Sequence, residues 1–161
     1  MLKLNRTTEY GLIALTYIRN KVEGELTSAR EIADRFDLPF EILAKTLQRL
    51  KDQNVIASTY GTRGGYILSR DLVTLSLGEF VKMMEGPVAM VACTHPDVEH
   101  QDCGYRGQCN IRGMMSQLND RFSDFLNRIS IEELTRTPLN HSITPTASVS
   151  QAAAAFQGGE P

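Results

Sequence analysis

The sequence lacks an apolar run near the roughly 18 to 20 residues that a membrane-spanning helix needs. Its first residues, Met-Leu-Lys-Leu-Asn-Arg, lack the apolar region of a secretory signal. It also lacks a nucleophile–base constellation and a glycine-rich phosphate loop before a helix. We therefore expect a cytoplasmic protein that has no membrane partner and is not an enzyme.

Cysteine is scarce, and its three copies, Cys93, Cys103 and Cys109, fall in one short stretch. An odd number cannot pair completely within one chain, and a reducing cytosol favours ligands or redox groups over disulfides. Nine residues separate the first two cysteines and five separate the last two. Three thiolates on a loop suit an iron–sulfur cluster or zinc. The absence of a Cys-x-x-Cys pair makes zinc the weaker candidate, and a metal-free thiol switch or three functionless cysteines remain alternatives.

Positive charge is also sparse overall, since the net charge is −2, but it is unevenly distributed. Residues 1–70 contain 11 Lys and Arg against 8 Asp and Glu, whereas residues 71–161 contain 6 against 11. DNA contacts are therefore expected in the first half. With 161 residues, 42% of them hydrophobic, the chain can form one compact domain and a helical extension.

Helical periodicity begins near the N-terminus. Apolar residues from Tyr10 to Ile18 recur at three- and four-residue steps, which predicts a first helix with Thr7 as its N-cap. Ser28 and Glu31 have the spacing of a capping box, which predicts the start of a second, short helix that ends near residue 37.

A third helix is predicted from about Pro39, in the first helical position, to Asp52. Its expected buried residues are Phe40, Leu43, Leu47 and Leu50. The opposite face contains Glu41, Ala44, Lys45 and Gln48. Two short helices with a polar face on the second are typical of a helix-turn-helix, although an ordinary solvated face would look the same.

The next segment favours the DNA-binding interpretation. Residues 55–60 and 66–69 are rich in strand-forming residues and flank a glycine-rich turn, which predicts a β-hairpin wing. Arg63 lies at its tip, where a guanidinium can reach a minor groove or a phosphate, or simply remain solvated. The expected DNA-binding residues are Ser28, Arg30, Glu41, Ala44, Lys45, Gln48, Arg49 and Arg63.

After the wing, Ser76 and Glu79 form a second capping box, with Leu75 and Phe80 as a hydrophobic staple, and the helix ends at Glu85. A long amphipathic helix is predicted from about Asn110, with a stripe of large apolar residues. This stripe can pack on its own chain or pair with a second copy. The residues expected at a dimer interface are Ile111, Met115, Leu118, Phe122, Phe125 and Ile129.

Four motifs in residues 1–136 resemble the winged-helix Rrf-type regulators, which include IscR and NsrR. They are residues 8–12 (Thr-Glu-Tyr-Gly-Leu), 47–50 (Leu-Gln-Arg-Leu), the wing 61–66 and the lead 86–93 into the first cysteine. The segments 85–87 and 109–113 are most similar to the branch that regulates the SUF iron–sulfur assembly system. The resemblance implies a homodimeric transcription regulator that reads a palindromic operator in double-stranded DNA.

The resemblance also implies an iron–sulfur cluster, [2Fe-2S] or [4Fe-4S], bound by Cys93, Cys103 and Cys109. The first gap between cysteines is longer than is usual in the family, and Arg112 stands where IscR has a histidine ligand. Glu9 matches a carboxylate that reaches the partner subunit's cluster in related sensors, and the alternatives are His95, His100, water or a small thiol. Such a cluster would report cluster supply or oxidative or nitrosative stress and control iron–sulfur assembly genes.

The expected fold is mainly α with a small β-hairpin: a winged helix-turn-helix with a long C-terminal dimerisation helix. We expect a DNA-binding domain in residues 1–86, a cysteine loop in 87–109, the dimerisation helix and a short terminal helix in 110–136, and a disordered tail in 137–161. The competing interpretation is a winged-helix regulator or protein-interaction module with a structural zinc or a thiol switch.

Overall fold

The computed structural model describes residues 3–61, 64–91 and 108–136. Its elements follow the order α1 (Arg6–Arg19), α2 (Ala29–Phe36), α3 (Phe40–Asp52), β1 (Ile56–Thr59), β2 (Gly65–Leu68), α4 (Leu77–Glu85), α5 (Arg112–Arg128) and α6 (Ile131–Arg136). The predicted fold class, mainly helical with a small antiparallel hairpin, is confirmed. No helix in the described ranges combines the length and apolar character needed to cross a membrane.

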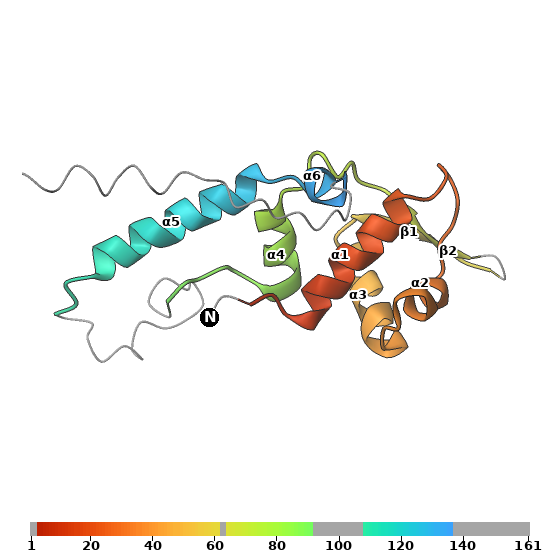
Figure 1. The fold of residues 1–161 in the computed structure, drawn as a ribbon, viewed down its shortest axis with the longest axis horizontal. Helices are drawn as coiled ribbons and strands as arrows, with labels where there is room; N and C mark the ends of the chain where they lie inside the picture. Colours follow the sequence, from red (N-terminus) through yellow and green to blue (C-terminus); the bar gives the residue numbers. More distant parts are fainter. Residues whose placement is uncertain (1–2, 62–63, 92–107, 137–161) are drawn as a thin grey trace, which may run out of the picture.

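The core lies where α1 crosses α3, and α4 and α6 also pack against α1 (Figure 1). Leu43, Leu47 and Leu50 of α3 are buried, as their spacing predicted, and Phe80 of α4 is buried beside them. Ile131 is also completely buried, and its backbone N–H donates to the carbonyl of Leu75 at 2.8 Å. The C-terminal helix α6 therefore completes the core of the winged helix.

The prediction that Phe40 is buried is wrong, because this residue is 42% exposed. It occupies the first position of α3, after Pro39, which is the N-cap rather than the first helical residue. The guanidinium of Arg30 lies 4.8 Å from the centre of its ring, so a cation–π contact covers part of the aromatic surface.

Side-chain caps begin four of the described helices, including α6, where Ser130 Oγ accepts from the backbone N–H of Glu133 at 3.1 Å. Ser28 and Ser76 accept from the backbone N–H groups of Glu31 and Glu79, as predicted. The predicted cap at Thr7 is wrong, because α1 begins two residues earlier than that cap implies and Asn5 Oδ1 accepts from the N–H of Thr8 at 2.9 Å. A long-range hydrogen bond from the backbone N–H of Asn5 to Glu85 favours this cap.

The strands pair antiparallel, with Ile56 opposite Leu68 and Thr59 opposite Gly65. The hairpin projects beyond α2 and α3 at one end of the molecule (Figure 1). Tyr66 extends the pairing to Thr27, which joins the wing to the segment before α2. The wing is therefore fixed to the start of α2 as well as to α3, which leads directly into β1.

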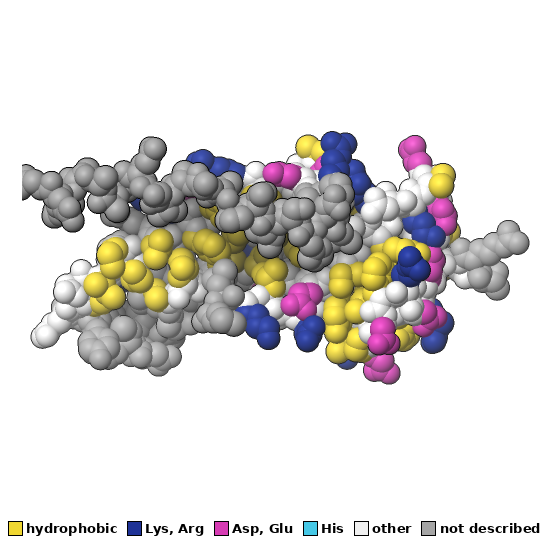
Figure 2. Space-filling view, in the orientation of Figure 1, with side chains coloured by type: hydrophobic (Ala, Val, Ile, Leu, Met, Phe, Trp, Pro, Cys, Tyr) yellow, Lys and Arg dark blue, Asp and Glu magenta, His cyan; other side chains and the backbone are white. Residues whose placement is uncertain are grey.

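Helix α5 leads away from the winged helix at the opposite end and packs against α4 (Figure 1). It begins at Arg112, two residues later than predicted, and none of its residues is buried. Large apolar side chains gather on its surface (Figure 2). Those at least 40% exposed, counting the adjoining residue 111, are Ile111, Met114, Leu118 and Phe125.

Candidate functional site

The recognition helix α3 presents a polar face. Burial of its leucines leaves Glu41, Lys45 and Gln48 exposed and Ala44 partly exposed, as expected from their spacing. Gln48 Nε2 donates to Asp52 at 2.7 Å, so one end of this amide is already engaged. The face offers a carboxylate, an amide, an ammonium and a methyl group, which together suit base edges and phosphates in a major groove.

Several cations of the winged helix are neutralised by carboxylates. Arg19 forms two hydrogen bonds of 2.6 Å with Glu132, which lowers the pKa of that carboxyl below its ordinary value. Arg70 likewise binds Glu79, at 2.6 and 2.9 Å. In the described part of the chain, Lys45 has no ion-pair partner within 4 Å, which leaves its charge available for a phosphate or a base.

Arg49 has a different environment from the other residues expected to contact DNA. Its Nη1 donates to the main-chain carbonyl of Met84 at 2.7 Å. Met84 lies in the last turn of α4, where helix carbonyls lack intrahelical partners. The guanidinium therefore caps α4 and ties it to the recognition helix.

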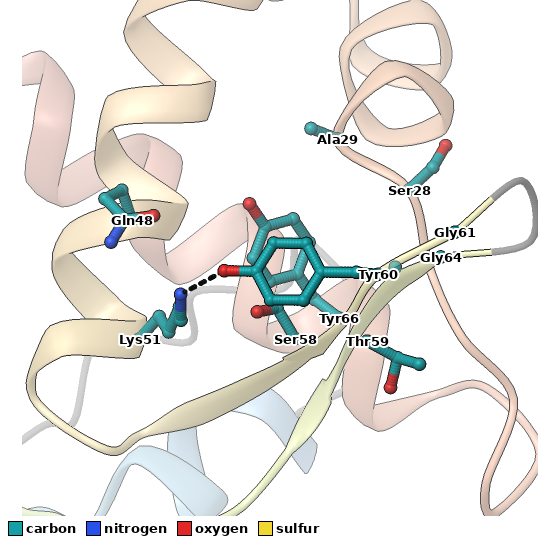
Figure 3. Close-up of a pocket in the computed structure, with 11 residues that line it drawn as sticks. Ser28, Ala29, Gln48, Lys51, Ser58, Thr59, Tyr60, Gly61, Gly64 and Tyr66 are labelled. Carbon is teal, nitrogen blue, oxygen red and sulfur yellow. Dashed lines mark hydrogen bonds between the residues drawn. The ribbon is translucent and has the colours of Figure 1, made fainter.

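The wing approaches the C-terminal half of α3 across a cleft of about 260 Å³ (Figure 3). Lys51 Nζ donates to the Tyr60 hydroxyl at 3.0 Å across this cleft. The hydrogen bond from Lys51 lowers the pKa of Tyr60, and the same contact raises the pKa of Lys51. The sequence analysis missed both residues; the available signal was a lysine in the last turn of the helix and a tyrosine beside the wing glycines. Arg63 lies outside the described residues.

The proposed metal ligands are only partly described, since Cys93 and Cys103, like His95 and His100, lie outside the described ranges. Cys109 is a free, partly exposed thiol three residues before α5. Glu9 lies in the first turn of α1, with a side chain 39% exposed and 3.2 Å from Arg6. No group of three or more His, Cys, Asp and Glu residues able to hold a metal occurs within the described segments.

The end of α4 connects these regions. The Glu85 carboxylate accepts from the backbone N–H of Asn5 at 2.8 Å and from the Thr8 hydroxyl at 2.6 Å. These contacts fix the cap of α1 at Asn5 and hold Thr8, the residue before Glu9. Together with the Arg49–Met84 hydrogen bond, they join the start of α1 and the end of α3 to the last turn of α4. We call this contact, made by Asn5, Thr8, Arg49, Met84 and Glu85, the α4 junction.

Comparison with known proteins identifies the fold and the family. A family model described as Rrf2, iron-dependent transcriptional regulator, matches residues 4–137. The chain belongs to the Rrf2 family. The HTH-type transcriptional regulator NsrR of Shouchella clausii (strain KSM-K16) is 23% identical over 133 residues, which cover 83% of this chain and 88% of that protein.

Solved structures share the Rrf2 fold. CymR (YrzC), the global cysteine regulator of B. subtilis, has a TM-score of 0.64 and 24% identity, with 84% of this chain and 97% of that one covered. The IscR of T. potens has a TM-score of 0.61 and 19% identity, with 83% and 85% covered. The oxidized form of Staphylococcus aureus CymR has a TM-score of 0.61 and 20% identity, with 85% and 98% covered.

Membership of the Rrf2 family settles the general activity. The protein is a winged-helix transcription regulator and not an enzyme. The matched region includes α3, the wing, the cysteine stretch and α5. The exposed polar face of α3 is accordingly the part of the described structure best suited to read DNA.

Proposed function

We propose that this chain is a homodimeric Rrf2-family regulator that senses cellular iron–sulfur status, or oxidative or nitrosative stress, through an iron–sulfur cluster. Cys93, Cys103 and Cys109 would supply thiolate ligands, and Glu9 of the partner subunit a carboxylate. The observation that carries the proposal is the α4 junction, which links the element before the cysteine stretch to both the recognition helix and the start of α1. Genes for iron–sulfur assembly are the proposed targets.

The donor set fits such a group. Cys109 is free and partly exposed, and thiolates are the usual ligands of iron–sulfur clusters. Among the described residues, the Glu9 side chain pairs with Arg6, whose side chain is 75% exposed, and exposed pairs of this kind contribute little. A carboxylate is a harder and weaker ligand for iron than a thiolate. When bound, the cluster would supply a redox-active centre whose ligands respond to oxidants and nitric oxide.

The junction offers a route from that centre to DNA. Gly86 and Pro87 end α4 and lead towards Cys93, so a change in the cysteine stretch acts first on the last turn of α4. That turn is bonded to α3 through Arg49 and to the cap of α1 through Glu85. Glu9 from the partner would add a second connection, from the first helix of one subunit to the cysteines of the other.

The proposed dimer uses the exposed side of α5. Ile111, Met114, Leu118 and Phe125 lie on one helical face and are 43–58% exposed. Phe122 and Leu126 instead face Leu77 and Val81 of α4 around a cavity of about 420 Å³. A face of large exposed side chains is costly for an isolated helix and suits pairing with the same helix of a second subunit. Two winged helices held in this way would read the halves of a palindromic operator.

Metal analysis of the full chain purified without oxygen tests the proposal. We expect iron and acid-labile sulfide, together with visible absorption that disappears when Cys109 is replaced by Ser. A colourless protein with one zinc per chain would instead establish the structural-zinc alternative. Glu9→Ala should retain a cluster on the three cysteines but lose it faster in air. If Glu9→Ala matches the parent while His95→Ala or His100→Ala changes the spectrum, the fourth ligand is a histidine.

A thiol switch without a cluster is the second candidate. It is favoured by the fold shared with the CymR structures, one of which is an oxidized form. Operator binding by metal-free protein that is lost with peroxide and restored by a thiol reductant would support this candidate. The same protein would show neither iron nor sulfide.

A further inference from the structure

The cleft between α3 and the wing has features that base reading does not explain (Figure 3). It lies beside the last turn of α3. The residues that line it include Ser28 at the start of α2, Gln48 and Lys51 of α3, and Tyr60 and Gly61 of the wing. The cleft has a small volume, about 260 Å³. It opens to the surface formed by the recognition helix and the wing. Polar side chains and aromatic rings both line it, and Lys51 is the cation among the lining residues.

That cation is not neutralised by the protein. Lys51 has no carboxylate within 4 Å among the described residues, and the adjacent Asp52 carboxylate accepts from Gln48 instead. By contrast, Lys21 of the same winged helix binds two carboxylates, Glu25 and Glu31, at 2.8 and 2.6 Å. The free charge at the cleft is therefore available to an anion.

Tyr60 holds this charge in place. Tyr60 is 84% exposed, so its contact with Lys51 lies at the surface, where a ligand can reach it. Lys51 Nζ lies 3.0 Å from the hydroxyl oxygen and 5.4 Å from the ring centre. An ammonium has three donors, and one goes to Tyr60, so two remain for a ligand. The contact also fixes the wing against the end of α3.

We propose that this cleft binds one phosphate of the DNA backbone, with Lys51 as the cationic ligand and Tyr60 as the residue that positions it. The inference rests on the DNA-reading part of the proposed function. A lysine binds phosphate as a point charge and carries no base information, whereas contacts to the backbone fix the register of a protein on its duplex. The Lys51–Tyr60 pair would thereby set the position of both the recognition helix and the wing.

Salt dependence of binding tests the phosphate contact. Lys51→Met retains the apolar stem and should weaken binding to the gene's own promoter and to an unrelated duplex by the same factor. The slope of log K against log salt should decrease by about 0.9, the value for one phosphate contact on B-DNA. Lys51→Arg should restore the slope. The matched control is Lys82→Met, which removes an exposed lysine from α4 and should leave the slope unchanged.

Tyr60→Phe tests the positioning role, because it removes the hydroxyl while the ring and the lysine charge remain. We expect weaker binding with the parental salt slope. An unchanged slope in Lys51→Met, or an equal decrease in Lys82→Met, would overturn the phosphate site; parental affinity in Tyr60→Phe would overturn the positioning role. Thermal unfolding of each variant shows whether it is folded. If the parent protein itself has no affinity for its promoter, the proposed function fails with the inference, whereas absence of iron leaves the phosphate test intact.

Discussion

Replacing Arg49 by Ala distinguishes a capping role from a DNA-contacting role. The structure gives Arg49 Nη1 a hydrogen bond of 2.7 Å to the carbonyl of Met84, at the C-terminal end of α4. Hydrogen bonds of a charged group contribute about 1.5–3 kcal/mol, and a cation near a helix C-terminus about 0.3–1 kcal/mol. Arg49 is largely exposed, so water replaces part of this contact. We expect Arg49→Ala to lower the free energy of unfolding by about 1–2 kcal/mol.

Unfolding in guanidinium chloride, followed by circular dichroism, measures this loss. The dependence of the free energy of unfolding on denaturant concentration should be unchanged. For a chain of this size, the loss corresponds to a melting temperature lower by about 2–4 °C per kcal/mol. Lys45→Ala is the comparison, because this exposed side chain should affect operator binding and leave stability unchanged. An Arg49→Ala variant with parental stability and an operator affinity reduced as in Lys45→Ala would refute the capping role.

Two further predictions concern stability against pH and self-association. The pKa of Glu132 is lowered from its ordinary 4.5 by Arg19, so this pair stabilises the fold above that value and the contribution is lost as the pH falls through the lowered pKa. Glu132→Gln should therefore be less stable than the parent at pH 7, and the difference in urea unfolding should vanish in strong acid; a constant difference would contradict the ion-pair explanation. Leu118→Glu should bury a charge at the proposed dimer interface and produce monomers in sedimentation, whereas Gln117→Glu on the polar face should not. An intact Leu118→Glu dimer would move the interface elsewhere.

Local patterns in the sequence were sufficient for most of the fold. The leucines of α3 and the caps Ser28 and Ser76 depend on residues within one or two helical turns, so their spacing predicted them. The predicted N-cap of α1, Thr7, was wrong because asparagine and threonine are both suitable N-caps by local rules. Glu85, 80 residues away, favours Asn5 as the cap because its carboxylate accepts from the backbone N–H of Asn5.

The candidate site was less predictable because its contacts join distant elements. The polar face of α3 follows from helical periodicity, but the Arg49–Met84 and Lys51–Tyr60 contacts depend on how α4 and the wing pack on α3. Periodicity also could not show which apolar residues of α5 face α4 and which remain exposed. Phe122 faces α4, and Phe125 is 58% exposed, although both belong to the predicted stripe.

The orientation of α5 depends on a close approach at Gly78, in the first turn of α4. A Cβ atom at this position would lie 3.0 Å from Cγ and 3.2 Å from the backbone nitrogen of Asn127 in α5. The Asn127 side chain can rotate away, but its backbone cannot, so Gly78→Ala requires α5 to shift by a few tenths of an ångström. The helix gains about 1 kcal/mol from alanine, whereas overpacking costs about 1–3 kcal/mol.

We therefore expect Gly78→Ala to be up to about 2 kcal/mol less stable than the parent. Gly113→Ala is the matched control, because a Cβ there meets no atom of the described residues within 4 Å and should leave the protein equally or more stable. A displaced α5 would also alter the separation of the two winged helices in the proposed dimer, and hence the preferred spacing between operator half-sites. Unfolding and binding to operators lengthened or shortened by one base pair measure both effects. If Gly78→Ala is as stable as Gly113→Ala and keeps the parental spacing preference, contact with α4 does not set the direction of α5.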